Sequence, residues 1–199
     1  MPSQFTKDAL SQRISWDSID TEYIDSIIAQ AKAEDMSGLG LKKTLSHPLD
    51  VTSEIISNTD KGKASLIARE TFTLCGLNMV PLILKHYDPS LTFSTNHQDG
   101  ESVTDDQSFG IIEGSSKSLL QAERILLNFL QYLSGIATTT KTYCNCLGDS
   151  ETRLLDTRKT TPLYRILEKY ASVCGGAYNH RYGLYLSLIH ISEPTRQSS

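Results

Sequence analysis

Two basic dipeptides near the end of the chain are the residues best suited to chemistry. Arg158-Lys159 and His180-Arg181 each lie beside a short apolar run that reads as a strand. The segment from Arg153 to Arg181 holds six lysines and arginines against two acids, whereas the whole chain has a net charge of −4. Positive charge concentrated in an acidic protein indicates a site for a small anion rather than a surface for polyanions.

The residues after the first apolar run suit the binding of a carboxylate. Arg158 can hold a carboxylate through two parallel N–H bonds, and Lys159 adds a point charge. Backbone N–H groups at the start of a following helix add donors for an anion. A generic Arg-Lys pair is more often a solvated loop in which Thr160 or Thr161 caps the helix, so the dipeptide alone does not decide between these two interpretations.

The elements expected around the dipeptides form a β–α–β unit. We expect a strand over Arg153–Thr157, a helix over Pro162–Val173 with proline at its first position, and a strand over Ala177–Tyr185. This order and its spacing of about 25 residues suit a parallel sheet or barrel. Ligands bind beyond the carboxyl ends of such strands, so both dipeptides would meet at one end of the unit and face one multiply charged anion.

The residues before this unit read as a mixed α/β domain. Residues 1–14 are polar and are expected to be loosely ordered. Asp20 is the expected N-cap of an amphipathic helix over roughly 21–35. We expect strands over 63–70, 91–95 and 109–113 and a helix over 76–87 that contains Pro81. A long buried helix follows Ser115 and stops at Gly148. Gly135 lies inside this long helix and either ends its first part or permits close packing.

Composition argues against several classes of protein. No run of residues approaches the ~18 apolar residues that span a bilayer. The N-terminus lacks the apolar centre of a secretion signal, so we expect a cytoplasmic protein with no membrane partner. The negative net charge and dispersed lysines argue against nucleic-acid binding. The four cysteines lack C-x-x-C spacing, so we expect buried or half-buried free thiols and no metal ligands.

The segment Leu154–Tyr185 strongly resembles the quinolinate phosphoribosyltransferase family, also called carboxylating nicotinate-nucleotide pyrophosphorylases. The resemblance rests on LLDTRKTTP, on LEKYA followed by CGG, and on NHRYGLY. It extends upstream to ERILLNFLQYLSGIAT at Glu123–Thr138 and, more weakly, to Asp50–Thr52, Gly62–Leu77 and the Asp99-Gly100 turn. It therefore covers most of residues 20–185.

The resemblance implies an α/β enzyme of two domains. After a tail at 1–20, an α+β sandwich domain with a long helical linker would occupy residues 21–150. The first part of an open α/β barrel would occupy residues 151–185. In this family the N-terminal domain leans on the barrel of a partner subunit, so we expect a homodimer or a larger homo-oligomer.

The resemblance also implies roles for individual residues. Arg124 would reach the substrate pocket from the neighbouring subunit. Lys159 and His180 are the candidates for catalytic roles. The two carboxylates of quinolinate would be bound by a group of five residues in this chain, Arg158, Lys159, Thr160, His180 and Arg181.

The implied reaction joins quinolinate to phosphoribosyl pyrophosphate in NAD biosynthesis. The pyridine nitrogen would attack the anomeric carbon as pyrophosphate leaves. The positively charged ring nitrogen would then stabilise the carbanion left when CO2 departs, which gives nicotinate mononucleotide. Mg²⁺ would neutralise the leaving pyrophosphate. Its ligands, like most of the phosphoribosyl pyrophosphate site, are expected on later strands and not in this chain.

The chain departs from the family pattern at two positions. Leu163 stands where the family has glycine after Thr161-Pro162, and Leu186 stands where it usually has aspartate. The run Leu186–Arg196, LSLIHISEPTR, looks like a translated sequencing adapter. We therefore expect residues 186–199 to be non-native, the enzyme to be truncated at its C-terminal end, and this polypeptide to be inactive or nearly so.

Two other interpretations of the sequence stay open. The chain can belong to a related phosphoribosyltransferase that acts on another pyridine or pyrrole acid, which a substrate screen would show. It can also be a non-catalytic module for dicarboxylate binding or dimerisation, which would bind quinolinate without regard to phosphoribosyl pyrophosphate.

Overall fold

The computed structural model describes residues 12–43, 50, 53–57 and 60–184. Residues 51–52 of the weakly matching stretch Asp50–Thr52 and the adapter-like tail at 186–199 lie outside these ranges. None of the described helices is long and apolar enough to cross a membrane. The helices are α2 (Thr21–Ser37), α3 (Met79–Tyr87), α4 (Ser116–Leu147) and α5 (Arg165–Cys174), with short 3-10 turns at Trp16–Ser18 and Ser53–Ile55.

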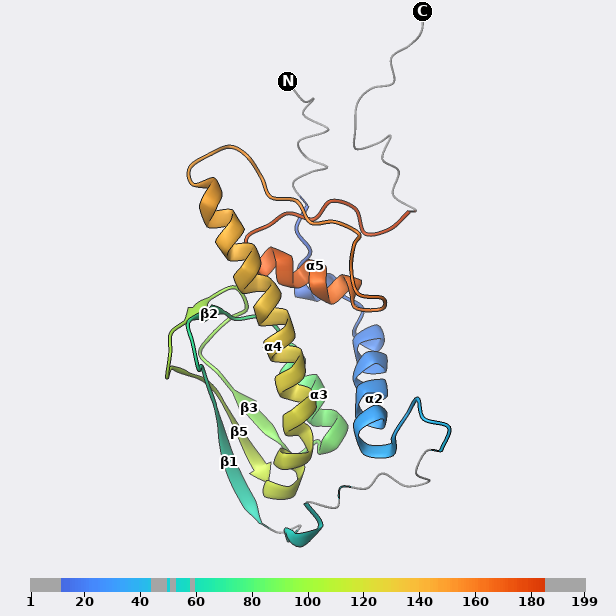
Figure 1. Ribbon diagram of the computed structural model, residues 1–199. Helices are drawn as coiled ribbons and strands as arrows, with labels where there is room; N and C mark the ends of the chain where they lie inside the picture. Colours follow the sequence, from blue (N-terminus) through green and yellow to red (C-terminus); the bar gives the residue numbers. More distant parts are fainter. Residues whose placement is uncertain (1–11, 44–49, 51–52, 58–59, 185–199) are drawn as a thin grey trace, which may run out of the picture.

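A three-stranded antiparallel sheet forms one side of the molecule (Figure 1). Its strand order is β1 (Lys61–Ile67), β5 (Ser108–Ser115) and β3 (Thr92–Ser94). A second pair joins β2 (Phe72–Thr73) to β4 (Ser102–Val103). Helices α3 and α4 pack against the sheet, and α2 packs against both of them. The strands expected at 63–70, 91–95 and 109–113 are confirmed, although the first ends at Ile67. The helix expected at 76–87 is confirmed from Met79 onward.

The ends of two helices follow signals that are local in the sequence. Oδ1 of Asp20 accepts a hydrogen bond from the backbone N–H of Glu22 at 2.9 Å, which caps α2. Oγ of Ser115 accepts one from the N–H of Ser118, which caps α4. Gly148 follows the last residue of α4 as predicted. These caps satisfy helix N–H groups that have no partner within the helix.

Pro81 and Gly135, two residues of types that can interrupt a helix, both lie inside helices. Pro81 lies in the first turn of α3, where its missing N–H is not needed. Gly135 lies in the middle of α4, which continues through it. It is exposed, and a Cβ at this position would meet nothing within 4 Å. Both roles predicted for Gly135, ending a helix and permitting close packing, are therefore wrong.

One apolar core joins the sheet, the first three helices and α5. Its fully buried members include Ile28 of α2, Ile83 of α3 and Leu133 of α4. Leu167 and Ala171 of α5 belong to the same cluster and expose none of their surface. The last described segment therefore packs onto the rest of the fold, across the C-terminal half of α4 (Figure 1).

The β–α–β unit after α4 is present in reduced form. Leu155 and Tyr178 form a single parallel bridge. Asp156 N–H donates to the Tyr178 carbonyl, and Tyr178 N–H donates to the Leu154 carbonyl, both at 2.9 Å. The parallel order is confirmed, but among the described residues the strands expected at 153–157 and 177–185 are wrong beyond this bridge, and Tyr185 lies outside those residues. Each segment has only the other as a parallel partner among the described residues, and two lone parallel segments make a weak ladder.

The helix of this unit begins later than expected. We predicted a first helical residue at Pro162, but α5 starts at Arg165. Leu163 has a φ of +69°, in the left-handed region, and no right-handed helix can include such a residue. Pro162 therefore belongs to the turn before the helix.

Residues 12–14 contact the β–α–β unit. Asn179 N–H donates to the Gln12 carbonyl at 2.9 Å, and the Asn179 side-chain oxygen accepts from Ile14 N–H at 2.8 Å. The Arg13 guanidinium lies 4.1 Å from the centre of the Tyr178 ring. The expectation of loose order is therefore wrong for residues 12–14, and residues 1–11 lie outside the described part of the chain.

Candidate functional site

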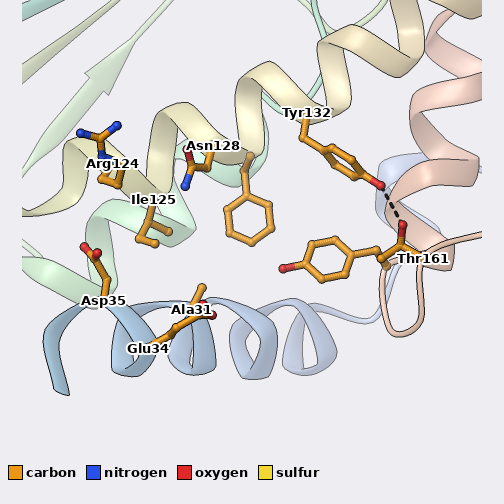
Figure 2. Close-up of a pocket in the computed structure, with 10 residues that line it drawn as sticks. Ala31, Glu34, Asp35, Arg124, Ile125, Asn128, Tyr132 and Thr161 are labelled. Atoms are coloured by element: carbon orange, nitrogen blue, oxygen red, sulfur yellow. Dashed lines mark hydrogen bonds between the residues drawn. The ribbon is translucent and has the colours of Figure 1, made fainter. Parts of the chain in front are cut away.

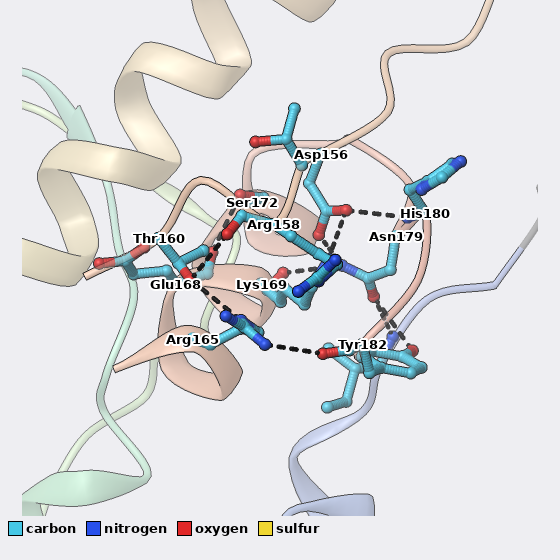
Figure 3. A network of polar contacts seen from close by, with 12 residues as sticks. Asp156, Arg158, Thr160, Arg165, Glu168, Lys169, Ser172, Asn179, His180 and Tyr182 are labelled. Carbon is cyan, nitrogen blue, oxygen red and sulfur yellow. Dashed lines mark hydrogen bonds and ion pairs between the residues drawn. The ribbon is translucent and has the colours of Figure 1, made fainter. Parts of the chain in front are cut away.

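A buried carboxylate holds together the two segments that carry the basic dipeptides. Oδ1 of Asp156 accepts from the Lys169 ammonium at 2.6 Å and from the backbone N–H of His180 at 2.8 Å (Figure 3). Its Oδ2 accepts from the side-chain amide of Asn179 at 2.7 Å. The side chains of Lys169 and Asp156 are 1% and 7% exposed, so this pair of opposite charges is hidden from water.

Arg158, two residues after Asp156 in the chain, has one unsatisfied donor. Its Nε is buried and has no hydrogen-bond partner among the described residues. Figure 3 shows the side chain lying among the residues of the Asp156 network. A buried donor without an acceptor costs about 1–3 kcal/mol, and more when the group is charged. An anionic ligand at this point would supply the missing acceptor.

His180 joins the Asp156 network through its backbone and not through its imidazole ring. Its N–H bonds to Asp156, while its imidazole points away from that carboxylate (Figure 3). His180 and Arg181 are both half-buried. Because Leu155 pairs with Tyr178, the dipeptides follow the same end of the parallel bridge. The structure thus places Arg158 and the His180-Arg181 dipeptide on neighbouring segments, as predicted.

Lys159 and Thr160 line a neighbouring cavity of about 410 Å³ between α4, α5 and residues 154–160. Lys159 is exposed, and its N–H donates to Oγ1 of Thr157 at 3.1 Å. Oγ1 of Thr160 accepts from Nε of Arg165 at 3.1 Å. The Thr160 hydroxyl is therefore already engaged by the protein.

Side chains from three helices fix the loop between Lys159 and α5. The Glu168 carboxylate accepts from Thr161 N–H with both oxygens, at 3.1 and 3.2 Å. The Tyr132 hydroxyl lies 3.0 Å from Oγ1 of Thr161 and donates to Glu168. Tyr23 donates to the Leu163 carbonyl at 2.6 Å. Partial burial and the bond to Glu168 raise the pKa of Tyr132. These hydrogen bonds connect the loop to α2, α4 and α5.

Sequence reasoning assigned no role to the two acids of the basic segment. Asp156 and Glu168 are the only acids between Arg153 and Arg181, and each accepts hydrogen bonds from the segments around the dipeptides. Their rarity within a basic stretch was the one available signal. No feature of the sequence predicted that Lys169 is buried, because a lysine in a short amphipathic helix is normally exposed.

Arg124 lies apart from the other candidate residues, in a cavity of about 600 Å³ between α2 and α4 (Figure 2). Asn128 of α4 and the acids Glu34 and Asp35 of α2 also line this cavity, and Tyr132 lies further along α4 (Figure 2). The structure does not bring Arg124 to the Asp156 network within one chain. The predicted role of Arg124 requires a second subunit, and it stays a prediction.

Asp99, in the turn that resembled the family weakly, also has a structural role. Its Oδ1 accepts from Leu77 N–H at 2.9 Å, and its Oδ2 accepts from Asn78 at 3.2 Å and from the Tyr170 hydroxyl at 2.9 Å. Burial and the neighbouring carboxylate raise the pKa of Tyr170. Asp99 thus connects the β2–α3 loop to α5.

No group of three or more His, Cys, Asp or Glu side chains within the described ranges is arranged to hold a metal ion. The oxygens of Asp156 and Glu168, the acids nearest the dipeptides, already accept protein donors and do not fit as Mg²⁺ ligands. All four cysteines are free. Cys75 is buried, and Cys144 and Cys174 are half-buried. Cys146 is exposed, so burial was wrongly predicted for it.

Comparison with known proteins finds one family along the chain. Residues 50–134 match the N-terminal domain of quinolinate phosphoribosyl transferase, and residues 136–192 match its C-terminal domain. The two matches meet inside α4, whereas the sequence placed the boundary near residue 150. The second match continues past Tyr185, beyond the described residues.

Individual relatives agree with these matches. A probable carboxylating nicotinate-nucleotide pyrophosphorylase of Synechocystis is 45% identical over 124 residues, which cover 62% of this chain and 42% of that protein. The Bacillus subtilis protein of the same name is 36% identical over 157 residues, 75% of this chain and 54% of that one. The solved nicotinate-nucleotide pyrophosphorylase of Francisella tularensis superposes with a TM-score of 0.78 at 30% identity, over 87% of this chain and 59% of that one.

The chain spans about half the length of the curated relatives it matches. Its mixed helix-and-strand architecture is that of its structural neighbours. The matched domains lie in the family's order and together cover most of the chain. This chain belongs to the quinolinate phosphoribosyltransferase family.

Proposed function

We propose that the two basic dipeptides form the quinolinate end of a phosphoribosyltransferase active site. The reaction would convert quinolinate and phosphoribosyl pyrophosphate to nicotinate mononucleotide, pyrophosphate and CO2. One observation carries the proposal: the segments of Arg158 and of His180-Arg181 are joined on one buried carboxylate, and Nε of Arg158 is buried without a partner among the described residues. The names of the relatives support the same reaction.

The arrangement suits an aromatic acid with two adjacent carboxylates. Cationic groups on two neighbouring segments can each hold one carboxylate, which orients the ring and its nitrogen for attack. In this proposal Arg158 and Arg181 bind the carboxylates, with Lys159, Thr160 and His180 completing the pocket and Lys159 and His180 closest to the chemistry. Mg²⁺ would arrive with phosphoribosyl pyrophosphate, and we assign it no ligand in this chain.

A second subunit completes the proposed site. Arg124 lies in the cavity between α2 and α4, away from the Asp156 network of its own chain. A homodimer would let Arg124 enter the partner's quinolinate pocket, and a larger homo-oligomer would serve equally. A cytoplasmic location is part of the same proposal and rests on the sequence alone.

Calorimetric titration of the 199-residue chain with quinolinate tests the proposal. We expect binding, and we expect Arg158→Met to weaken it by about tenfold or more, the loss of one charge-assisted hydrogen bond. Arg69→Met is the matched control, because Arg69 is 81% exposed in a surface pair with Asp106. Absence of quinolinate binding, or equal losses in both variants, would overturn the proposal. Tighter binding of another pyridine or pyrrole acid would show that the site belongs to a phosphoribosyltransferase for that acid.

A further inference from the structure

We propose that Asp156 is a positioning residue whose three hydrogen bonds set the spacing between the two basic dipeptides, and that this spacing makes the site prefer an acid with two adjacent carboxylates. The inference rests on the proposed function and deepens it. Asp156 does not itself touch substrate in this proposal. It acts through Arg158, two residues further along the chain, and through His180, whose backbone it holds.

The contacts of Asp156 can be made only by a carboxylate. Three donors, from Lys169, Asn179 and His180, converge on its two oxygens at 2.6 to 2.8 Å. An ionised carboxylate is purely an acceptor and can take all three. An asparagine of the same shape offers one acceptor oxygen, and its NH2 group would face another donor. At least one link between the segments must then break.

The links are stiff because their other ends are also fixed. Asn179 exposes none of its surface, and its amide donates to the Lys169 carbonyl at 3.1 Å as well as to Asp156. Its side-chain oxygen accepts from Ile14 N–H at 2.8 Å. A shift of Asp156 is therefore transmitted to the Asn179–Arg181 segment rather than absorbed by a flexible side chain.

Lys169 allows this carboxylate to lie beside an anion site. An unpaired negative charge next to Arg158 would repel the carboxylates of a ligand. The buried ammonium 2.6 Å from Asp156 cancels that charge, so the pair supplies geometry without net charge. Buried ion pairs often add little stability compared with apolar residues, which is consistent with a positioning role.

A ratio of dissociation constants separates positioning from simple loss of stability. Partial unfolding raises the apparent dissociation constants of all ligands by the same factor, the inverse of the folded fraction. The ratio of the constants for nicotinate, with one carboxylate, and quinolinate, with two, is therefore unchanged by destabilisation alone. Altered spacing between the dipeptides lowers the ratio, because only quinolinate needs both segments in register.

The experiment titrates the full chain and its variants with quinolinate and with nicotinate. We expect Asp156→Asn to lower the ratio by about tenfold, the factor for one lost hydrogen bond to a charged group. Asn179→Ser, which leaves the ion pair intact, should lower the ratio by about threefold. This variant tests the positioning role if Asp156→Asn does not fold. Asp99→Asn is the matched control, because Asp99 also accepts three donors and connects to α5 without touching either dipeptide segment.

The outcomes distinguish this inference from the proposed function. A reduced ratio in the Asp156 and Asn179 variants, with the parent ratio kept in Asp99→Asn, supports the positioning role. A parent-like ratio in Asp156→Asn or Asn179→Ser overturns that role while the proposed function stands. A parent chain that binds quinolinate no better than nicotinate overturns the proposed function, and the inference with it.

Discussion

The ammonium nitrogen of Lys169 lies 2.6 Å from Oδ1 of Asp156, and both side chains are almost completely buried. This ion pair joins α5 to the segment before the first basic dipeptide. The same carboxylate reaches the segment of the second dipeptide through Asn179 and His180. One buried carboxylate thus connects all three parts of the β–α–β unit, and leaving it without its counter-charge should destabilise the unit.

Lys169→Met should lower the free energy of unfolding by about 3–5 kcal/mol, because it leaves the Asp156 carboxylate buried without its counter-charge. Urea denaturation followed by circular dichroism measures the change. Lys63→Met is the control, since Lys63 pairs with Glu113 at 3.0 Å while both side chains are more than half exposed. This control should change stability by less than about 0.5 kcal/mol. Similar losses in both variants would contradict the importance of the buried pair.

Gly175→Ala and Gly135→Ala should have opposite effects on stability. A Cβ on Gly175 would clash with the Ala137 carbonyl oxygen and lie 2.5 Å from Cβ of Thr140, so α5 must move away from α4. We expect a loss of about 1–3 kcal/mol from this overpacking. Gly135 lies in open space within α4, and alanine there should add about 0.5–1 kcal/mol through helix propensity. Thermal denaturation of the two variants checks the signs, and equal signs would refute the packing argument.

Leu163→Gly should stabilise the protein by about 0.5–1 kcal/mol, because leucine is strained in the left-handed region and glycine is not. The φ of Leu163 is +69°, and the residue is 65% exposed, so little packing is lost. Leu163→Ala is the control, since alanine keeps the Cβ that causes the strain. Chemical denaturation that shows the same gain for alanine as for glycine would rule out backbone strain as the cause.

Asp88 should make stability depend on acidity. Hydrogen bonds from Ser90, with a further one from the Ser118 hydroxyl, hold the pKa of Asp88 below its ordinary value. A carboxyl group with a lowered pKa in the folded state stabilises that state above its unfolded pKa, near 4, and the contribution is lost as pH falls through the folded pKa.

Asp88→Asn tests this dependence, because the amide does not titrate. The parent chain should lose more stability between pH 5 and about pH 3 than Asp88→Asn does, as measured by urea midpoints at each pH. Ser90→Ala should show an intermediate loss, since it removes only part of the hydrogen bonding to Asp88. Parallel pH profiles for the parent and Asp88→Asn would show that this carboxyl group is not linked to folding.

Local signals in the sequence were sufficient for the framework. Asp20 and Ser115 cap their helices, and Gly148 follows the end of α4, because a cap depends on residues within one helical turn of it. The apolar alternation of the strands and the basic dipeptides were also visible in the order of residues. So was the family, which rests on short motifs around Arg158 and His180.

The packing of the elements decided which glycines and charged side chains are buried, and the order of residues did not predict this. Gly135 was expected to end a helix or to permit close packing and lies in open space, whereas Gly175 is pressed against α4. Lys169 is buried because an acid 13 positions earlier, Asp156, lies beside it in space. The sequence by itself determined the cationic groups and the parallel order of the segments that carry them. Only the tertiary structure decided which carboxylate holds those groups together, because hydrogen bonds between distant residues depend on how the elements pack.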